Sequence, residues 1–228
     1  MKKIPVDKLI DFRRKKLDRA KITVLKSTQK EKEKKADGSG GNYWVSCLSA
    51  IINLFIDDSE DLIAEKIDDL RNRIKRTQHL LTKQRWQKNI DILFAFQEYD
   101  MASIKPGGKL TFLKKPKEKS ILKIKDVLIE SNPSHVFTFS NNGFEEIGAV
   151  WFVIKKDGFN KSELGMFTDI MYRYLMLNYS DKFKINPKYC IAVDLVNCQE
   201  VNYYQLLNGD ISFLLDNTID EVKKLFNN

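Results

Sequence analysis

The pattern of hydrophobic and polar positions predicts strand, strand, helix and strand between residues 136 and 194. Hydrophobic residues alternate over 136–139, and a longer hydrophobic run covers 148–154. The Asn-Asn-Gly sequence at 141–143 indicates a hairpin turn, and the residues that follow it make the expected connection longer than two residues. Hydrophobic residues at helical spacing then predict a helix from about residue 162 to 178, and residues 189–194 predict a buried strand.

Two glycine-containing breaks divide the chain into segments. A helix is expected over residues 5–20, within a basic arm that covers 1–36, and residues 37–41 are expected to form a flexible Gly-rich linker. Hydrophobic residues at three- and four-residue steps predict three amphipathic helices, which make a helical subdomain over 42–104. A Lys-Pro-Gly-Gly break begins the last segment, 105–228, which contains the hairpin, the helix and the buried strand.

These elements together predict an α+β protein with an α/β-like core. The helical subdomain precedes a mixed β-sheet, and the hairpin-helix-strand unit is expected at the centre of that sheet. Two more strand-like segments, 110–113 and 121–124, flank a basic turn at 114–119 and are expected to form a lysine-tipped hairpin.

The net charge of +8 is concentrated in two parts of the chain. Residues 1–36 contain 14 Lys/Arg and 5 Asp/Glu, and residues 105–125 contain 8 and 1, whereas 37–104 and 126–228 carry net charges of −3 and −5. Localised basic segments suit a polyanionic partner, because Lys and Arg contacts to phosphates release counterions. The candidate nucleic-acid contacts are Arg13, Arg14, Lys15, Lys16, Lys114, Lys115 and Lys117.

Each basic segment also has an explanation that involves no nucleic acid. A charged arm keeps a protein in solution, and lysines beside an edge strand oppose aggregation. Lys83, Arg85 and Lys88 extend the cations of residues 71–76 into another basic patch, but solvated helix faces have the same pattern.

Several classes of protein are disfavoured by what the sequence contains. Three scattered Cys and two His residues have no zinc-site spacing and indicate a reducing, cytoplasmic location. The first residues are followed by charges rather than by an apolar segment, and no hydrophobic run approaches the roughly 18 residues of a membrane span. The P-loop, the dinucleotide-binding fingerprint and the nucleophile elbow of serine hydrolases are all missing.

A lysine ends the hairpin's second strand, and a helix and a buried strand follow it. This order over residues 136–194 resembles the core of the PD-(D/E)XK nuclease superfamily. The resemblance implies phosphodiester hydrolysis with Mg²⁺ or Mn²⁺, in which carboxylates hold the metal and the lysine positions or activates the attacking water.

The resemblance assigns catalytic and metal-binding roles to individual residues. It implies Lys155 as the lysine, although Val153 stands where the family has a carboxylate. Glu146, near the hairpin turn, is then a candidate metal ligand. Glu163, near the start of the following helix, is a candidate for the missing carboxylate, with both a catalytic and a metal-binding role. The alternative is that Lys155 ends an ordinary core strand and that Glu163 occupies a favourable first-turn helix position.

Three hypotheses for the function follow, and the weakest is a basic arm that binds an anionic membrane, because the apolar face of the arm is short and has no tryptophan. The first is a nucleic-acid-associated protein with a nuclease-like core, either a binder or a divergent metal-dependent phosphodiesterase of a bacterial defence or mobile-element system, which requires Mg²⁺ only if it is catalytic. The second is a non-catalytic interaction or scaffold subunit of a bacterial protein complex, whose basic arm docks an acidic protein partner. The missing carboxylate favours the second hypothesis. Convergence of Glu146, Glu163 and Lys155 would favour a catalytic site.

Overall fold

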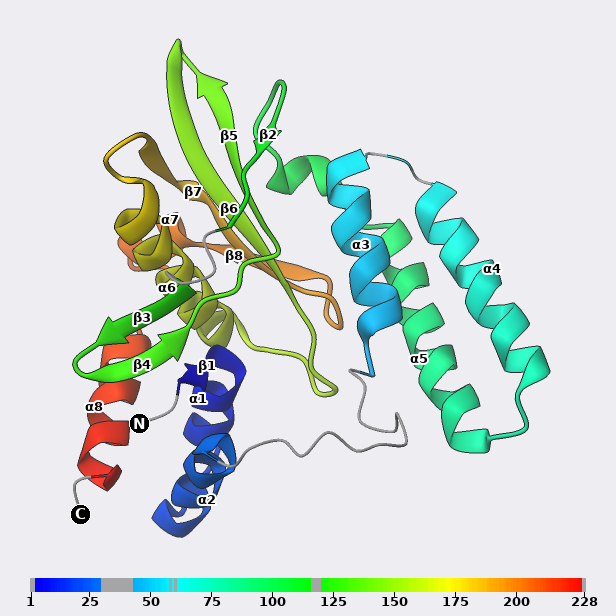
Figure 1. Ribbon diagram of the computed structural model, residues 1–228, viewed down its shortest axis with the longest axis horizontal. Coiled ribbons are helices and arrows are strands. Elements are labelled where there is room, and N and C mark those ends of the chain that lie inside the picture. Colours follow the sequence, from blue (N-terminus) through cyan, green and yellow to red (C-terminus); the bar gives the residue numbers. More distant parts are fainter. Residues whose placement is uncertain (1–2, 30–42, 58, 60, 116–119, 227–228) are drawn as a thin grey trace.

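The computed structural model describes residues 3–29, 43–57, 59, 61–115 and 120–226 (Figure 1). The α-helices are α1 (Val6–Arg13), α2 (Asp18–Gln29), α3 (Val45–Asp57), α4 (Asp61–Arg76), α5 (Leu80–Gln97), α6 (Lys161–Tyr179), α7 (Tyr203–Leu207) and α8 (Leu215–Phe226), and η1 (Met101–Ile104) is a 3-10 helix. The strands are β1 (Ile4–Pro5), β2 (Thr111–Phe112), β3 (Ile121–Ile124), β4 (Val127–Glu130), β5 (His135–Asn141), β6 (Phe144–Val153), β7 (Lys184–Asp194) and β8 (Gln199–Asn202). The α+β prediction is confirmed.

A five-stranded sheet in the order β2-β5-β6-β7-β8 forms the centre of the molecule. β6 and β7 are parallel, and the other neighbouring pairs are antiparallel. The parallel pair requires a crossover connection, which α6 supplies. A smaller sheet, β1-β4-β3, lies beside the central one (Figure 1).

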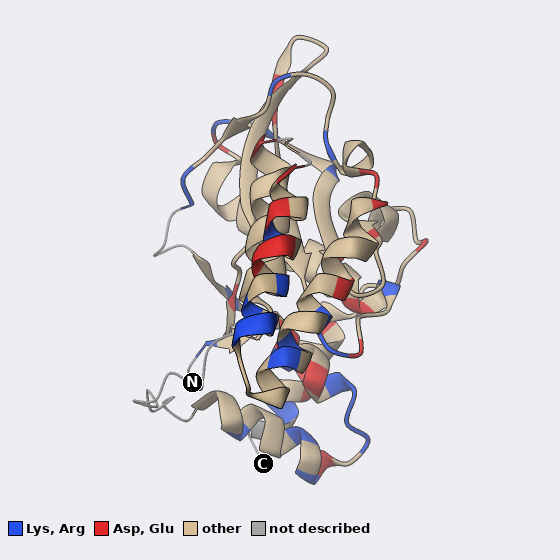
Figure 2. Ribbon diagram, turned by 90° about the vertical axis from the view of Figure 1, so that its right-hand side faces the viewer, with Lys and Arg blue, Asp and Glu red and all other residues tan. Residues whose placement is uncertain are grey.

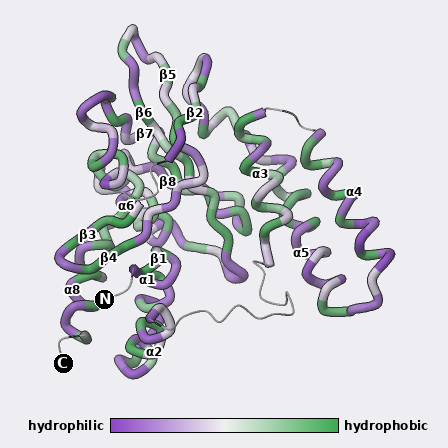
Figure 3. The backbone as a smooth tube through the Cα atoms, viewed as in Figure 1, coloured by the Kyte–Doolittle hydropathy of each residue, from purple (hydrophilic) through white to green (hydrophobic). Residues whose placement is uncertain are grey.

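Both faces of the central sheet are buried because helices cover each of them. Successive residues of a strand point to opposite faces, so Cys190 and Ala192 contribute to one hydrophobic core and Ile191 and Val193 to the other. Helices α1, α6 and α8 contribute to the first core, and α3–α5 to the second. Figure 3 shows hydrophobic and hydrophilic residues alternating along α4, whose apolar stripe faces this second core. The helical subdomain is therefore packed on the sheet.

The central hairpin differs from the sequence-based expectation of a long connection. β5 and β6 are joined by a two-residue turn, because Asn141 pairs with Phe144. Asn142 and Gly143 both have positive φ, at 49° and 82°, which is the backbone twist that a tight hairpin turn requires. The Asn-Gly signal was therefore sufficient, and the longer connection was wrong.

The expected lysine-tipped hairpin is also wrong. β2 pairs with β5 in the central sheet, whereas β3 pairs with β4 in the small sheet. The partner of β3 comes immediately after it, across a turn in which Lys125 and Asp126 both have positive φ. Four residues of the connection between β2 and β3, 116–119, lie outside the described residues.

The first helix of the chain differs most from its prediction. Instead of one helix over 5–20, α1 and α2 are separated by a turn at residues 14–17. Leu9, Ile10 and Phe12 are completely buried in the first core, and β1 pairs with β4. The start of the expected arm is thus part of the core, because the apolar side chains of α1 are buried in it. The expected linker at 37–41 lies outside the described residues.

Every helix in the described ranges is too short or too polar to cross a lipid bilayer.

Burial of α1 predicts a large loss of stability when its aromatic side chain is truncated. We expect Phe12→Ala to lower the free energy of unfolding by about 3–5 kcal/mol, because it removes a fully buried ring. Leu17→Ala is the matched control: Leu17 is 72% exposed, so the change should stay within about 0.5 kcal/mol. Urea unfolding measures both, and equal midpoints would show that α1 is a detached arm.

Candidate functional site

The candidate site lies where the parallel strands β6 and β7 end. After β6, the chain passes through residues 154–160 into α6. Asp194, the last residue of β7, is completely buried and accepts hydrogen bonds from the Phe159 and Val196 N–H groups at 2.9 and 3.0 Å. A third bond, from Asn197 Nδ2, completes its environment. Asp194 therefore fixes the loop that carries Lys155.

Glu163 is held in the first turn of α6 by bonds at both of its carboxylate oxygens. Asn160 caps the helix by accepting from the Glu163 N–H, and Glu163 Oε2 accepts from the Asn160 N–H. Arg14 then binds the same carboxylate through Nε and Nη2, at 2.7 and 2.6 Å, and donates to the Gly158 carbonyl. The Glu163 side chain is only 7% exposed. This carboxylate is fully engaged in a bidentate, partly buried ion pair.

Lys155 is paired in a similar way with a second residue of α1. Its ammonium group donates to Asp11 Oδ1, and Lys8 donates to Asp11 Oδ2 at 3.1 Å. The side chains of Lys155 and Asp11 are 21% and 24% exposed. Each polar group that the sequence resemblance highlighted at this end of β6 is therefore bound by a residue of α1 or of the turn that follows it.

The electrostatics of the site keep both carboxylates ionised. Burial alone would raise the pKa of Glu163, but hydrogen bonds from Arg14 and the Asn160 N–H hold it below its ordinary value. Burial also opposes ionisation of Asp11, whose pKa is nevertheless lowered by hydrogen bonds from Lys155 and Lys8. The hydrogen bond to Glu163 raises the pKa of Arg14. Two carboxylates and three cations thus form a compensated cluster.

Glu146 lies at the other end of β6 and does not join this cluster. Val153 is seven positions further along β6, which corresponds to about 23 Å along a strand. Its buried carboxylate accepts from Asn141, Lys184 and Asn186 at 3.0, 2.9 and 2.6 Å. These bonds tie the hairpin to the start of β7. The structure therefore brings Lys155 and Glu163 near each other but leaves Glu146 apart.

The donor set at the end of β6 does not fit a divalent metal such as Mg²⁺. Such an ion needs oxygen ligands that converge on open coordination positions. Asp11 and Glu163 instead share their oxygens with cationic side chains. No group of three or more His, Cys, Asp or Glu side chains in the described parts of the chain is arranged to hold a metal ion.

The basic residues of the α1–α2 turn have different environments. Arg13 donates to Thr218 of α8 at 3.0 Å, and Arg14 is engaged by Glu163. Lys15 and Lys16 are exposed. They follow the end of α1 in the turn before α2.

The basic residues after β2 are not equivalent either. Lys114 is exposed, whereas Lys115 is half-buried and donates to the Pro133 carbonyl at 2.5 Å. Burial lowers the pKa of Lys115. Lys117 lies outside the described residues. Lys115 therefore anchors the segment before β5 and is poorly placed to contact a partner.

An open concavity of about 450 Å³ adjoins the ion-pair cluster. α1 and the following turn contribute Arg13 and Arg14 to it, and the start of α6 contributes Lys161 and Ser162. Residues from two distant parts of the sequence thus place three cations around one hollow, beside the N-terminus of a 19-residue helix. This end of a helix carries a partial positive charge.

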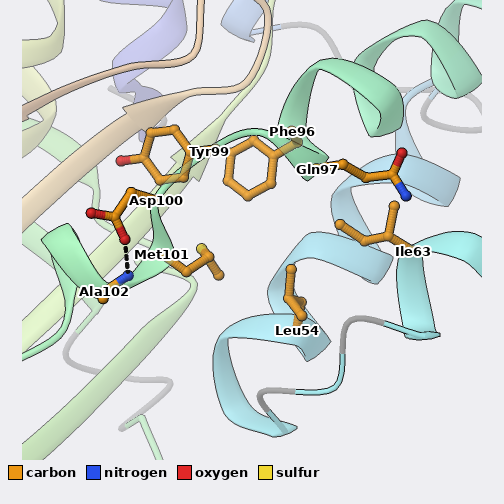
Figure 4. Close-up of a pocket in the computed structure, with 8 residues that line it drawn as sticks. All are labelled: Leu54, Ile63, Phe96, Gln97, Tyr99, Asp100, Met101 and Ala102. Atoms are coloured by element: carbon orange, nitrogen blue, oxygen red, sulfur yellow. Dashed lines mark hydrogen bonds between the residues drawn. The ribbon is translucent and has the colours of Figure 1, made fainter.

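Another concavity, of about 360 Å³, lies among α3, α4, α5 and η1 (Figure 4). Leu54, Ile63, Phe96 and Met101 provide its apolar lining. Asp100 is turned onto the Ala102 N–H, at 2.9 Å, and caps η1 (Figure 4). Because the Asp100 carboxylate is used as this cap, the residues that line the hollow offer no arrangement of acid, base and nucleophile.

Sequence reasoning missed Asp11 and Asp194 as members of the site. Asp11 meets Lys155 across 144 positions of sequence, and local spacing contains no signal for such a contact. Asp194 was recognisable only as the last residue of a buried strand, where parallel strand ends commonly gather polar groups.

Loss of the Arg14 side chain should destabilise the fold measurably. Arg14→Ala leaves the buried Glu163 carboxylate without its charged partner, and we expect a loss of about 2 kcal/mol. Lys123→Ala is the control, because the side chains of the Lys123–Asp126 pair are 67% and 74% exposed and solvent screens their attraction, so its loss should change stability much less. Equal effects in urea unfolding would contradict a structural role for the Arg14 pair.

The same pair predicts a pH dependence of stability. Because the pKa of Glu163 is lower in the folded than in the unfolded chain, its contribution is present above its ordinary value of 4.5 and is lost as pH falls through the folded-state pKa. The stability difference between the parent and Arg14→Ala should therefore be full well above pH 4.5 and should shrink as the pH falls below that value. A difference that stays constant over this range would show that the ion pair is not its source.

Comparison with protein-family models, with curated proteins and with solved structures finds no significant match for this chain, so its own residues carry the functional argument.

Proposed function

We propose that this protein binds nucleic acid through the α1–α2 turn and the start of α6, and that it does so without cleaving its partner. The observation that carries the proposal is the concavity in which Arg13, Arg14 and Lys161 come together. Exposed Lys15 and Lys16 continue from its edge. These five cations are the site to which the proposal refers.

The chemistry of this site suits a phosphate backbone. Arg14 is held in place by Glu163, so its guanidinium group keeps a defined orientation at the edge of the hollow. Lys161 lines the hollow, and the exposed Lys15 and Lys16 directly follow Arg14, so these lysines are available to contact phosphates. The positive end of α6 adds to the potential. Binding through such contacts is independent of sequence and sensitive to salt.

The topology gives the proposal further support. A hairpin, a helix and a strand follow each other as β5-β6, α6 and β7, and Lys155 comes two residues after β6. This is the order on which the resemblance to a nuclease-like core depends. A chain with this order of elements, in which the nearby carboxylates are ion-paired, is consistent with recognition of nucleic acid without hydrolysis.

The absence of cleavage follows from the ion pairs. Asp11 contacts Lys155, Glu163 begins the following helix, and both carboxylates are neutralised by cations that packed elements hold in place. Releasing them would require movement of α1, whose Leu9, Ile10 and Phe12 are fully buried. The site is therefore assigned a binding role and not a catalytic one.

A salt series with labelled duplex DNA, single-stranded DNA and RNA tests the binding proposal. The full chain should bind at least one of them, with the logarithm of the association constant falling steeply with that of the salt concentration. In Lys15→Ala/Lys16→Ala/Lys161→Ala we expect the magnitude of this slope to fall by about 2 to 3, because each lost phosphate contact removes about 0.9.

The control variant is Lys109→Ala/Lys182→Ala/Lys224→Ala, which removes the same charge from exposed positions outside the site. Its slope should equal that of the parent. No binding of any nucleic acid at low salt would refute the proposal and favour a scaffold role with an acidic protein partner. Equal losses in the two triple variants would show a response to net charge alone.

Cleavage is tested separately by adding Mn²⁺ to the bound nucleic acid. We expect the substrate to remain intact with the parent and with Lys155→Ala alike. Metal-dependent cleavage by the parent that Lys155→Ala abolishes, with unchanged folding by circular dichroism, would restore the phosphodiesterase hypothesis.

A further inference from the structure

The hairpin formed by α4 and α5 extends beyond the rest of the helical subdomain. Asn89 of α5 lies beside the start of α3, because its side chain accepts a hydrogen bond from the Cys47 N–H and donates one to the Tyr43 carbonyl. The nine α5 residues before Asn89 run past that point, and the last turns of α4 accompany them (Figure 1). We call residues 71–88, the end of α4, the connection and the start of α5, the α4–α5 tip.

Two consecutive leucines at the α4–α5 tip face away from the core. Leu80 and Leu81 begin α5 and are 74% and 69% exposed, the largest exposed fractions among its hydrophobic side chains. Further along the helix, Ile90 and Leu93 turn to the opposite side and are buried. The two leucines therefore contribute nothing to the hydrophobic core that the structure describes.

The charge around these leucines is of one sign. Residues 71–88 contain seven Lys/Arg and no Asp/Glu. Figure 2 shows basic residues gathered toward the lower end of the α4–α5 pair, below the acidic residues of α4. Arg71 and Arg73 pair with Asp68 and Asp69 of the preceding turn. Among the described residues, the remaining cations of the tip have no carboxylate within 4.0 Å: Lys75, Arg76, Lys83, Arg85 and Lys88.

We propose that the α4–α5 tip docks on the surface of an anionic lipid bilayer. Leu80 and Leu81 would enter the boundary between headgroups and acyl chains, and the surrounding cations would lie at the level of the acidic headgroups. Stable attachment to a membrane surface usually takes two signals, and a polybasic patch combined with an apolar insertion provides both. The charges and the exposed leucines are thereby explained together.

Other occupants explain only part of the tip. A nucleic-acid backbone would neutralise the cations, but it would leave two leucines in water. A second copy of this chain could cover Leu80 and Leu81, but tip-to-tip contact would bring two sets of uncompensated cations together. The bilayer is therefore the partner that matches both features.

This surface is independent of the proposed nucleic-acid site. It uses residues of α4 and α5, whereas that site uses the α1–α2 turn and the start of α6. Failure of either proposal therefore leaves the other untouched, and the variants below separate them.

Binding of the full chain to sonicated or extruded vesicles tests the proposal. We compare vesicles of phosphatidylcholine alone with vesicles that also contain phosphatidylglycerol, and we measure co-sedimentation. The parent should bind the anionic vesicles and leave the neutral ones largely unbound. Equal binding to both, or to neither, would overturn the proposal.

Variants of the tip identify the residues responsible. Leu80→Ser/Leu81→Ser should weaken binding to anionic vesicles by roughly tenfold or more, because less apolar surface is inserted. Lys75→Ala/Arg76→Ala should weaken it by about 25-fold, at about fivefold per cation near the surface. Both should keep the parent's urea midpoint, since these side chains are exposed.

Leu17→Ser is the matched control. Leu17 is 72% exposed and also follows basic residues, so it differs from the two leucines of the tip chiefly in its position in the fold. Its binding to anionic vesicles should equal that of the parent. An equal loss in Leu17→Ser, or no loss in Leu80→Ser/Leu81→Ser, would contradict docking by the tip. Loss of nucleic-acid binding instead of vesicle binding in the tip variants would reassign this surface to nucleic acid.

Discussion

The burial of α1 in the first hydrophobic core determines what the candidate site can do. Leu9, Ile10 and Phe12 are buried on one side of this helix, so Asp11 and the following Arg14 are presented to the end of β6 and the start of α6. The apolar face thus fixes the position of the charged one. Because hydrophobic burial holds the helix in addition to the ion pairs, its charged groups stay in place whatever occupies the neighbouring concavity.

The same packing leaves the hairpin-helix-strand unit intact but commits the carboxylates at its end to ion pairs. The sheet, the crossover helix and a lysine near the end of β6 are all present, but the carboxylates beside that lysine are neutralised. Glu146 serves the opposite end of the strand, where three donors hold the hairpin to β7. The carboxylates near Lys155 therefore serve to position Arg14 and the neighbouring cations. The function that we propose for this surface is binding of a polyanion.

Much of the fold was predictable because it depends on local patterns. The helix expected at 162–178 is α6, at Lys161–Tyr179, since a long run with helical spacing ends at identifiable caps. β7 begins at Lys184, five residues before its expected start. The hydrophobic pattern did not reveal this first half, because it is polar and is paired with β6 over only part of its length. The break between α1 and α2 was missed: Arg14 leaves the helix and binds Glu163, 149 positions away.

The site was predictable only in part, because only some of its contacts are local in the sequence. Lys155 and Glu163 belong to one strand-loop-helix segment, so their proximity follows from short-range topology. Asp11 and Arg14 reach them through tertiary packing, which a single sequence does not encode as a spacing. Glu146 was placed near the hairpin turn correctly, and the direction of β6 then carries it away from Lys155.

The most direct test of this account is an NMR titration of the isotopically labelled protein with Mn²⁺ in the presence of a short oligonucleotide. Mn²⁺ broadens the amide signals of residues close to a bound ion. If Asp11 and Glu163 are committed to their ion pairs, the signals of residues around Asp11, Lys155 and Glu163 should show no selective broadening, while the oligonucleotide shifts those of the α1–α2 turn. Selective broadening at Asp11 and Glu163 would contradict the account, because it would show that these carboxylates hold a metal ion beside the nucleic acid.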